Sequence, residues 1–219
     1  MSCEVGEMAQ TEAEKRFAEC HERLRAELNE GYWHFCAYTA LEDAIEEYLK
    51  EMSFAPCFFL LTLRAHRLQS LVPLANLLDN SAGSTGVLQL LRHCEKNPDI
   101  FLLNHVHKRV RGRESGAPSE AVDEHTVVDW VQEDRKKMWD LPVSDISLLR
   151  DKALAHIDKA NFGQAKVPIC FPNRPDVERC FRTLDDMLNR YSRAFSGRRW
   201  TMDLATGMLQ RELDALRMH

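Results

Sequence analysis

The chain has 219 residues, of which 44% are hydrophobic and 29% are charged, and its formal net charge is -5. This balance is typical of a soluble globular protein of one large or two small domains, and it excludes a disordered chain. The negative charge also excludes a chain-wide basic field, so any contact with RNA or DNA has to come from local basic clusters.

The cysteines and the apolar runs indicate where the protein functions. Seven cysteines are scattered along the chain without a Cys-x-x-Cys pair, so we expect reduced thiols and no metal site. The opening MSCEVGEMAQ is acidic and lacks the basic and apolar regions of a secretion signal. The most apolar run, APCFFLLTL, ends at Arg64 and is well under the roughly 18 residues of a membrane span. The sequence therefore predicts a cytoplasmic protein with no membrane anchor.

Helical periodicity predicts an all-α fold, because no alternating run of β-branched and aromatic residues is bounded by a hairpin turn. A capping box of Thr11 and Glu14 opens a long helix or helix pair that reaches about Leu49, with Gly31 as a point of interruption. The next helix runs from about Pro56 to Leu78 and ends at the turn residues DNSAGSTG.

A short helix, TGVLQLLRHCEKN, then stops at Pro98. The segment LNHVHKRVRGRESGAPSE follows, and its second half is predicted to be an exposed loop because it is rich in Gly, Pro, Ser and basic residues. Another helix covers about Glu120 to Met138, with Val127 and Val131 on its apolar side. We expect three tryptophans to lie in the core: Trp33, Trp130 and Trp139.

The last third of the chain contains three further predicted helices. The first begins with Ser144 as its N-cap and ends before Gly163 and Pro168. The segment DVERCFRTLDDMLNRYSRAF forms the second, and Gly197 separates it from a final helix over 201–218.

The helix that begins at Ser144, SDISLLRDKALAHIDK, carries charged groups close to its apolar face. On a helical wheel its core stripe consists of five residues: Ile146, Leu149, Ala153, Ile157 and Ala160. Arg150 and His156 project roughly 60° to either side of this stripe and lie about 9 Å apart along the axis. Small Ala153 between them would let another helix, or a second copy of this one, approach closely. An ordinary set of ion pairs within the helix is the alternative interpretation.

These residues also carry a resemblance. Arg150, the polar Asp151 and then, after five intervening residues, His156 resemble the signature of HEPN domains, the "higher eukaryotes and prokaryotes nucleotide-binding" superfamily. The early YWHFCAYTALEDAIEEY, the central LVPLANLLDNSAGSTGVLQLLRH and the late LLRDKALAHIDK are similar to its abortive-infection U-type branch. The similarity covers most of the chain.

The resemblance implies a single HEPN-like domain over 1–219, a bundle of about six to seven helices with 170–219 as a C-terminal helical pair packed on it. It implies a homodimer in which the Arg/His motifs of two protomers face each other in a shared cleft. It also implies metal-independent cleavage of RNA, as a toxin or antiviral-defence effector, without a cofactor and with an antitoxin or defence-system protein as a further partner.

The chemistry of the residues agrees with that activity. His156, with an ordinary pKa near 6.5, can take a proton from a ribose 2′-hydroxyl or give one to the leaving 5′-oxygen. Arg150 stays charged and can stabilise the phosphorane, an effect of roughly 3 kcal/mol for comparable donors. Asp151 would orient Arg150 or His156. The product would be a 2′,3′-cyclic phosphate.

The run HVHKRVRGR over 105–113 is the strongest basic cluster and can guide a phosphate backbone, although a solvated loop is the alternative. The predicted RNA-binding residues are Lys152, His107, Lys108, Arg109, Arg111 and Arg113. Two other basic runs, RKK at 135–137 and RYSRAFSGRRW at 190–200, are interpreted as solvated helix ends. Two further functions stay open, a non-catalytic module that binds nucleotide, RNA or protein, and an antitoxin-like partner protein.

Overall fold

The described part of the chain is helical. The structure is a computed structural model, and it describes residues 10–46, 49–81, 83–102, 122–142, 146 and 172–202. Within these ranges the regular elements are α1 (Glu12–Ala44), α2 (Leu49–Met52), α3 (Pro56–Leu78), α4 (Val87–Lys96), the 3-10 helix η1 (Pro98–Phe101), α6 (Glu124–Trp139) and α8 (Arg174–Ser196). The all-α prediction is therefore confirmed over the described residues.

Helix α1 begins at the predicted capping box and is not interrupted at Gly31. The Thr11 N–H donates to the Glu14 carboxylate at 2.8 Å, and the Glu14 N–H donates to the Thr11 hydroxyl at 3.2 Å. At Gly31, a Cβ atom would lie 3.1 Å from Cε1 of Phe181 and 3.2 Å from Cβ of Pro73. The glycine thus allows three helices to approach one another while the helical backbone continues through it.

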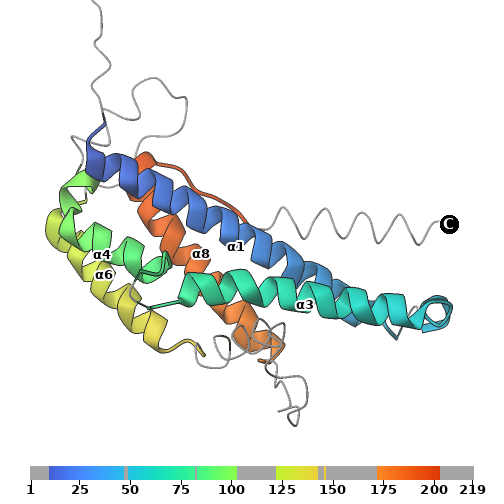
Figure 1. The fold of residues 1–219 in the computed structure, drawn as a ribbon. Coiled ribbons are helices and arrows are strands. Elements are labelled where there is room, and N and C mark those ends of the chain that lie inside the picture. The colour runs from blue at the N-terminus through green and yellow to red at the C-terminus, as the bar shows by residue number, and fades with distance from the viewer. Residues whose placement is uncertain are drawn as a thin grey trace, which may run out of the picture.

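Helices α1 and α3 form a long antiparallel hairpin with α2 at its tip (Figure 1). At 1.5 Å per residue, the 33 residues of α1 span about 50 Å. Helix α8 runs antiparallel to α1 on a second side of it. Phe17 contacts Phe195 at one end, with ring centroids 4.5 Å apart, and Asp43 pairs with Arg174 at 2.6 Å near the other. Figure 1 shows that the tip of the hairpin projects beyond the other labelled helices.

Helices α4 and α6 and η1 complete the bundle around the first part of α1. The Phe101 ring of η1 meets Phe17 edge-on at 5.1 Å, and Trp130 of α6 meets Tyr191 of α8 at 6.3 Å. One buried apolar cluster extends from Phe17 to Met202 in the sequence and includes side chains of all these helices. The first and last described helices therefore share one core.

The observed helix ends follow local capping chemistry. The second predicted helix has the expected bounds, Pro56–Leu78. Helix α6 begins at Glu124 and not at Glu120, because the Asp123 carboxylate accepts the N–H of Thr126 at 2.7 Å and so caps the helix there. Gly197 ends α8 in the left-handed conformation, with φ of 70°, as the sequence predicts for a C-cap glycine.

The prediction for the tryptophans was wrong at two of three positions. Trp139 is 75% exposed and Trp33 is 41% exposed, whereas Trp130 is partly buried against the core. Trp139 is the last residue of α6 and lies about 100° around the helix from Met138, the last member of the buried stripe. None of the helices in the described ranges is long and apolar enough to cross a membrane. The five cysteines in those ranges are free thiols.

Candidate functional site

The predicted catalytic and RNA-binding residues lie outside the described residues. Arg150, Asp151, Lys152 and His156 fall within 147–171, and the basic run that includes His107, Lys108, Arg109, Arg111 and Arg113 falls within 103–121. The structure describes the framework of residues that flank the motif, Ile146 before it and the start of α8 after it.

That framework is anchored in the core. Ile146 is helical and fully buried in the apolar cluster, as expected for the first residue of the core stripe on the predicted motif helix. On the far side of the segment, Asn173 caps α8, since its side-chain oxygen accepts the N–H of Asp176 at 2.9 Å. Both flanks of the Arg/His motif are thus fixed to the same bundle.

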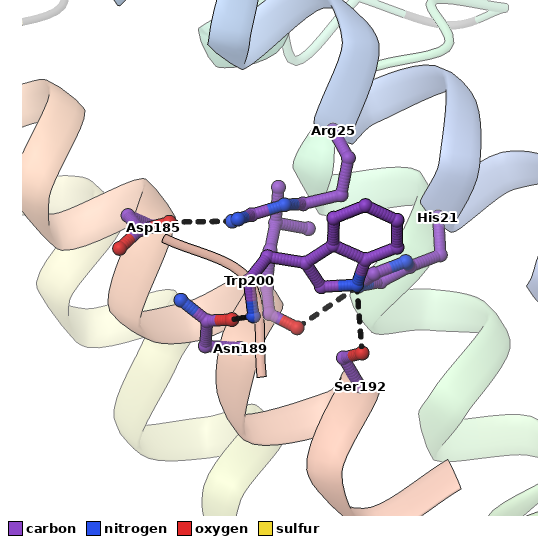
Figure 2. Close-up of polar contacts among 7 residues, drawn as sticks. His21, Arg25, Asp185, Asn189, Ser192 and Trp200 are labelled. Atoms are coloured by element: carbon purple, nitrogen blue, oxygen red, sulfur yellow. Dashed lines mark hydrogen bonds and ion pairs between the residues drawn. The ribbon is translucent and has the colours of Figure 1, made fainter. Parts of the chain in front are cut away.

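Among the described residues, a polar network joins α1, α8 and the segment that follows α8 (Figure 2). Arg25 is 3% exposed, and its Nη1 pairs with Oδ1 of Asp185 at 2.5 Å. Its guanidinium also lies over the indole of Trp200, 5.9 Å from the ring centroid. The Nε and Nη2 atoms of Arg25 are buried without a hydrogen-bond partner among the described residues.

Trp200 is held against α8 by two further hydrogen bonds. Its backbone N–H donates to Oδ1 of Asn189 at 2.8 Å, and its indole N–H donates to the Ser192 hydroxyl at 3.2 Å. Figure 2 shows the indole lying between Arg25 and Ser192. The segment after Gly197 is thereby attached to both α1 and α8.

His21 completes the network but is not arranged for proton transfer to a substrate. Its Nε2 donates to the carbonyl of Leu188 at 2.9 Å, and its side chain is buried beside the ring of Phe17. Burial lowers the pKa of His21 below its ordinary value, so the ring is neutral at neutral pH. The roles of His21 and Arg25 are therefore to hold α1 against α8.

Several described basic side chains make ion pairs that join two helices. Arg135 makes a bidentate pair with Glu95 of α4, at 2.7 and 2.8 Å. Arg190 pairs with Glu133 of α6 at 3.0 Å and lies over Trp130. From the sequence, the runs RKK at 135–137 and RYSRAFSGRRW at 190–200 are interpreted as solvated helix ends. That interpretation was wrong for Arg135 and Arg190, because the ion pair of each residue joins two helices.

Two pairs of titratable groups were not anticipated from the sequence. The Nδ1 atoms of His34 on α1 and His66 on α3 lie 2.9 Å apart, and burial lowers the pKa of both rings. Asp134 of α6 is fully buried near Tyr191, and burial raises the pKa of its carboxyl. Both arrangements join residues far apart in the sequence, so no spacing rule identifies them. The described residues contain no group of three or more metal-ligating side chains.

A comparison with protein families identifies the family of the chain, which the described geometry alone does not. The model of the HEPN family AbiU2 matches residues 14–216, which is nearly the whole chain. The chain belongs to the AbiU2 family of HEPN proteins. The match confirms membership of the abortive-infection U-type branch, and its range spans the positions of Arg150 and His156. Comparisons with curated proteins and with solved structures found no match for this AbiU2 protein.

Proposed function

We propose that this AbiU2 protein is a metal-independent endoribonuclease that acts in abortive infection by cleaving RNA through attack of a ribose 2′-hydroxyl. The observation that carries the proposal is the family match over 14–216, which spans a motif whose residue types suit this chemistry. A cytoplasmic homodimer, with the motif helices of two protomers side by side, would place two histidines in one cleft.

The buried Ile146 supports the orientation of that motif. Because Ile146 is helical and lies in the core, a helix that continues from it has its stripe of Leu149, Ala153 and Ile157 on the same face. Arg150 and His156 then lie at the two edges of the buried face, where their heads can reach a surface cleft. On such a helix the two residues are about 9 Å apart along the axis.

Each motif residue has a role in the proposed reaction. One His156 accepts the proton of the 2′-hydroxyl as this oxygen attacks the adjacent phosphorus, and the other donates a proton to the departing 5′-oxygen. Arg150 stabilises the negative charge that develops on the phosphorane, and Asp151 holds Arg150 or His156 in place. No metal ion is needed, since the substrate supplies its own nucleophile.

The basic run at 107–113, together with Lys152, would hold the RNA backbone. On the described helices, four arginines are already paired with carboxylates on α8, α4, α1 and α6: Arg25, Arg135, Arg174 and Arg190. Replacement of the cations in 107–113 by neutral residues should weaken RNA binding and make the binding less dependent on salt.

The test is cleavage of a labelled RNA by wild-type protein, His156→Ala and Arg150→Ala, in the presence of a chelator. We expect His156→Ala to abolish cleavage and Arg150→Ala to slow it by about 100-fold or more. Wild-type products should end in a 2′,3′-cyclic phosphate. His125→Ala is the matched control, since His125 is an exposed histidine of α6, and it should cleave like wild type.

A different result would favour the alternative function. If His156→Ala cleaves RNA as fast as wild type, the proposed mechanism is refuted. If the wild-type protein binds RNA without cleaving it, the chain is a non-catalytic binding module, a function that the negative charge of Asp151 beside Arg150 would favour. A stable heteromeric complex in place of the homodimer would identify the antitoxin-like role.

A further inference from the structure

The tip of the α1–α3 hairpin exposes an unusual amount of apolar surface. Five large side chains form this hairpin-tip patch: Leu49 (64% exposed), Phe54 (85%), Phe58 (64%), Leu60 (65%) and Leu61 (66%). All lie within thirteen consecutive positions, on α2, the turn after it and the first turns of α3. Single exposed apolar residues are common on protein surfaces, but five large ones so close together in the chain are typical of an interaction site.

The arrangement of the described helices explains why none of them buries the patch. The start of α3 reads PCFFLLTL, which is apolar around the whole circumference of the helix. Only one side of α3 faces α1, and the hairpin tip projects past α4, α6 and α8 (Figure 1). The remaining sides of α3 therefore keep Phe58 and Leu61 in contact with solvent.

An apolar groove adjoins the patch. It has a volume of about 290 Å³ and lies between the end of α1 and the start of α3. Its lining is almost wholly apolar and consists of Leu41, Ile45, Leu49, Ser53, Pro56, Phe59, Leu60 and Leu63. The hairpin tip thus presents both an exposed phenylalanine, Phe54, and an apolar groove that could receive such a side chain.

We propose that the hairpin-tip patch is a contact between two copies of this chain. The exposed area of its five side chains is roughly 600 Å², taking just under 200 Å² for each fully exposed side chain. With a polar rim, this approaches the roughly 800 Å² per partner of a stable protein–protein interface. The patch thus has the area that a dimer contact requires.

The shape and charge of the patch also suit a second copy. In a two-fold contact, the same surface of each protomer meets its counterpart, so Phe54 of one copy can enter the groove of the other and the reverse. The rim carries both signs of charge, with Glu46, Lys50 and Arg64 all exposed. A membrane-binding surface would instead be ringed by cations.

This contact is distinct from the pairing of motif helices under the proposed function, and either can fail without the other. The test has two readouts on the full-length chain. The first is sedimentation velocity over a range of protein concentrations, for wild type, the double variant Phe58→Glu/Leu61→Glu and the control Trp139→Glu. Trp139 is a matched control because it is 75% exposed but lies at the end of α6.

The second readout is local. Cys57 precedes Phe58 on α3 and is the exposed thiol among the described cysteines. Its rate of reaction with a thiol reagent is followed by peptide mass spectrometry at each protein concentration. If a second copy covers the patch, Cys57 becomes less reactive as the concentration rises.

We expect wild type and Trp139→Glu to show an association step that protects Cys57, and the double variant to weaken this step by about 100-fold or more. Unchanged urea unfolding would show that the double variant folds, since both replaced residues are exposed. Three outcomes would overturn the proposal: a Cys57 rate independent of concentration, protection of Cys57 without a change in sedimentation, and protection of Cys57 that the double variant retains. Association of the double variant that leaves Cys57 reactive belongs to the motif-helix contact.

Discussion

Replacement of Gly31 by alanine tests how closely α1, α3 and α8 approach one another. Alanine stabilises the middle of a helix by about 1 kcal/mol relative to glycine. At this position, however, the new Cβ would lie 3.1 and 3.3 Å from two ring carbons of Phe181 and 3.2 Å from Cβ of Pro73. Neither neighbour yields easily, because Phe181 is fully buried and Pro73 is a buried residue within α3.

The overpacking should outweigh the helical preference. Extra atoms in a packed core cost about 1–3 kcal/mol, so we expect Gly31→Ala to lower the free energy of unfolding by about 1 kcal/mol. Gly31→Val, which adds two more carbons and a β-branch, should cost more than 3 kcal/mol or prevent folding. Urea unfolding followed by circular dichroism measures the change, as a lower midpoint with the same slope.

A double-mutant cycle separates the two effects. Phe181→Leu removes the ring carbons that the new Cβ would meet, at the cost of a cavity. In that background Gly31→Ala should be neutral or stabilising, so the two substitutions should couple by 1 kcal/mol or more in magnitude. An additive cycle, or a Gly31→Ala protein that is more stable than wild type, would refute the argument for close packing.

Three further predictions concern groups that make contacts between elements of the bundle. Asp134→Asn should be at least as stable as wild type in urea at neutral pH, because burial raises the pKa of Asp134 and wild-type stability falls as the pH rises through that value. Oδ1 of Asp134 lies 3.3 Å from Nη1 of Arg190 and 3.6 Å from Nζ of Lys137, and lower stability of the variant at neutral pH would show that these ion pairs outweigh the cost of burial. Burial lowers the pKa values of His21, His34 and His66 in the folded protein. The melting temperature should therefore be highest above pH about 6.5, where these rings are neutral in both states, and should fall as the pH drops from there towards the lowered pKa values. His34→Gln/His66→Gln should flatten this dependence, and an equally steep melting-temperature profile would contradict it. Trp200→Ala should cost about 1–3 kcal/mol in urea unfolding through the loss of its contacts with Arg25 and Ser192, whereas Trp139→Ala should change stability by under about 0.5 kcal/mol.

Features that depend on neighbours in the sequence were predictable. The capping box of Thr11, the helix over Pro56–Leu78 and the glycine cap at Gly197 each depend on a few adjacent residues. Features that depend on distant contacts were not. Gly31 is typical of a helix interruption until Phe181 and Pro73 are known to pack against it.

The same distinction applies to the candidate site. The sequence identifies Arg150, Asp151 and His156, and the family match supports their significance, but their geometry lies outside the described residues. Ile146 is the described residue of that helix, and it is buried as the periodicity predicts. The ion pair of Arg25 with Asp185, and the histidine pair of α1 and α3, had no sequence signal because each joins helices that meet only in the folded bundle.

The distance along the chain between α1 and α8 affects how this protein is made. His21 and Leu188 are 167 positions apart, and Arg25 and Asp185 are 160 apart. At about 5–20 residues per second on the ribosome, α1 waits roughly 8–30 s for its partners on α8. Until then Phe17 lacks the ring of Phe195, and Arg25 lacks the carboxylate of Asp185. The packing of α1 is therefore completed only after α8 has been synthesised.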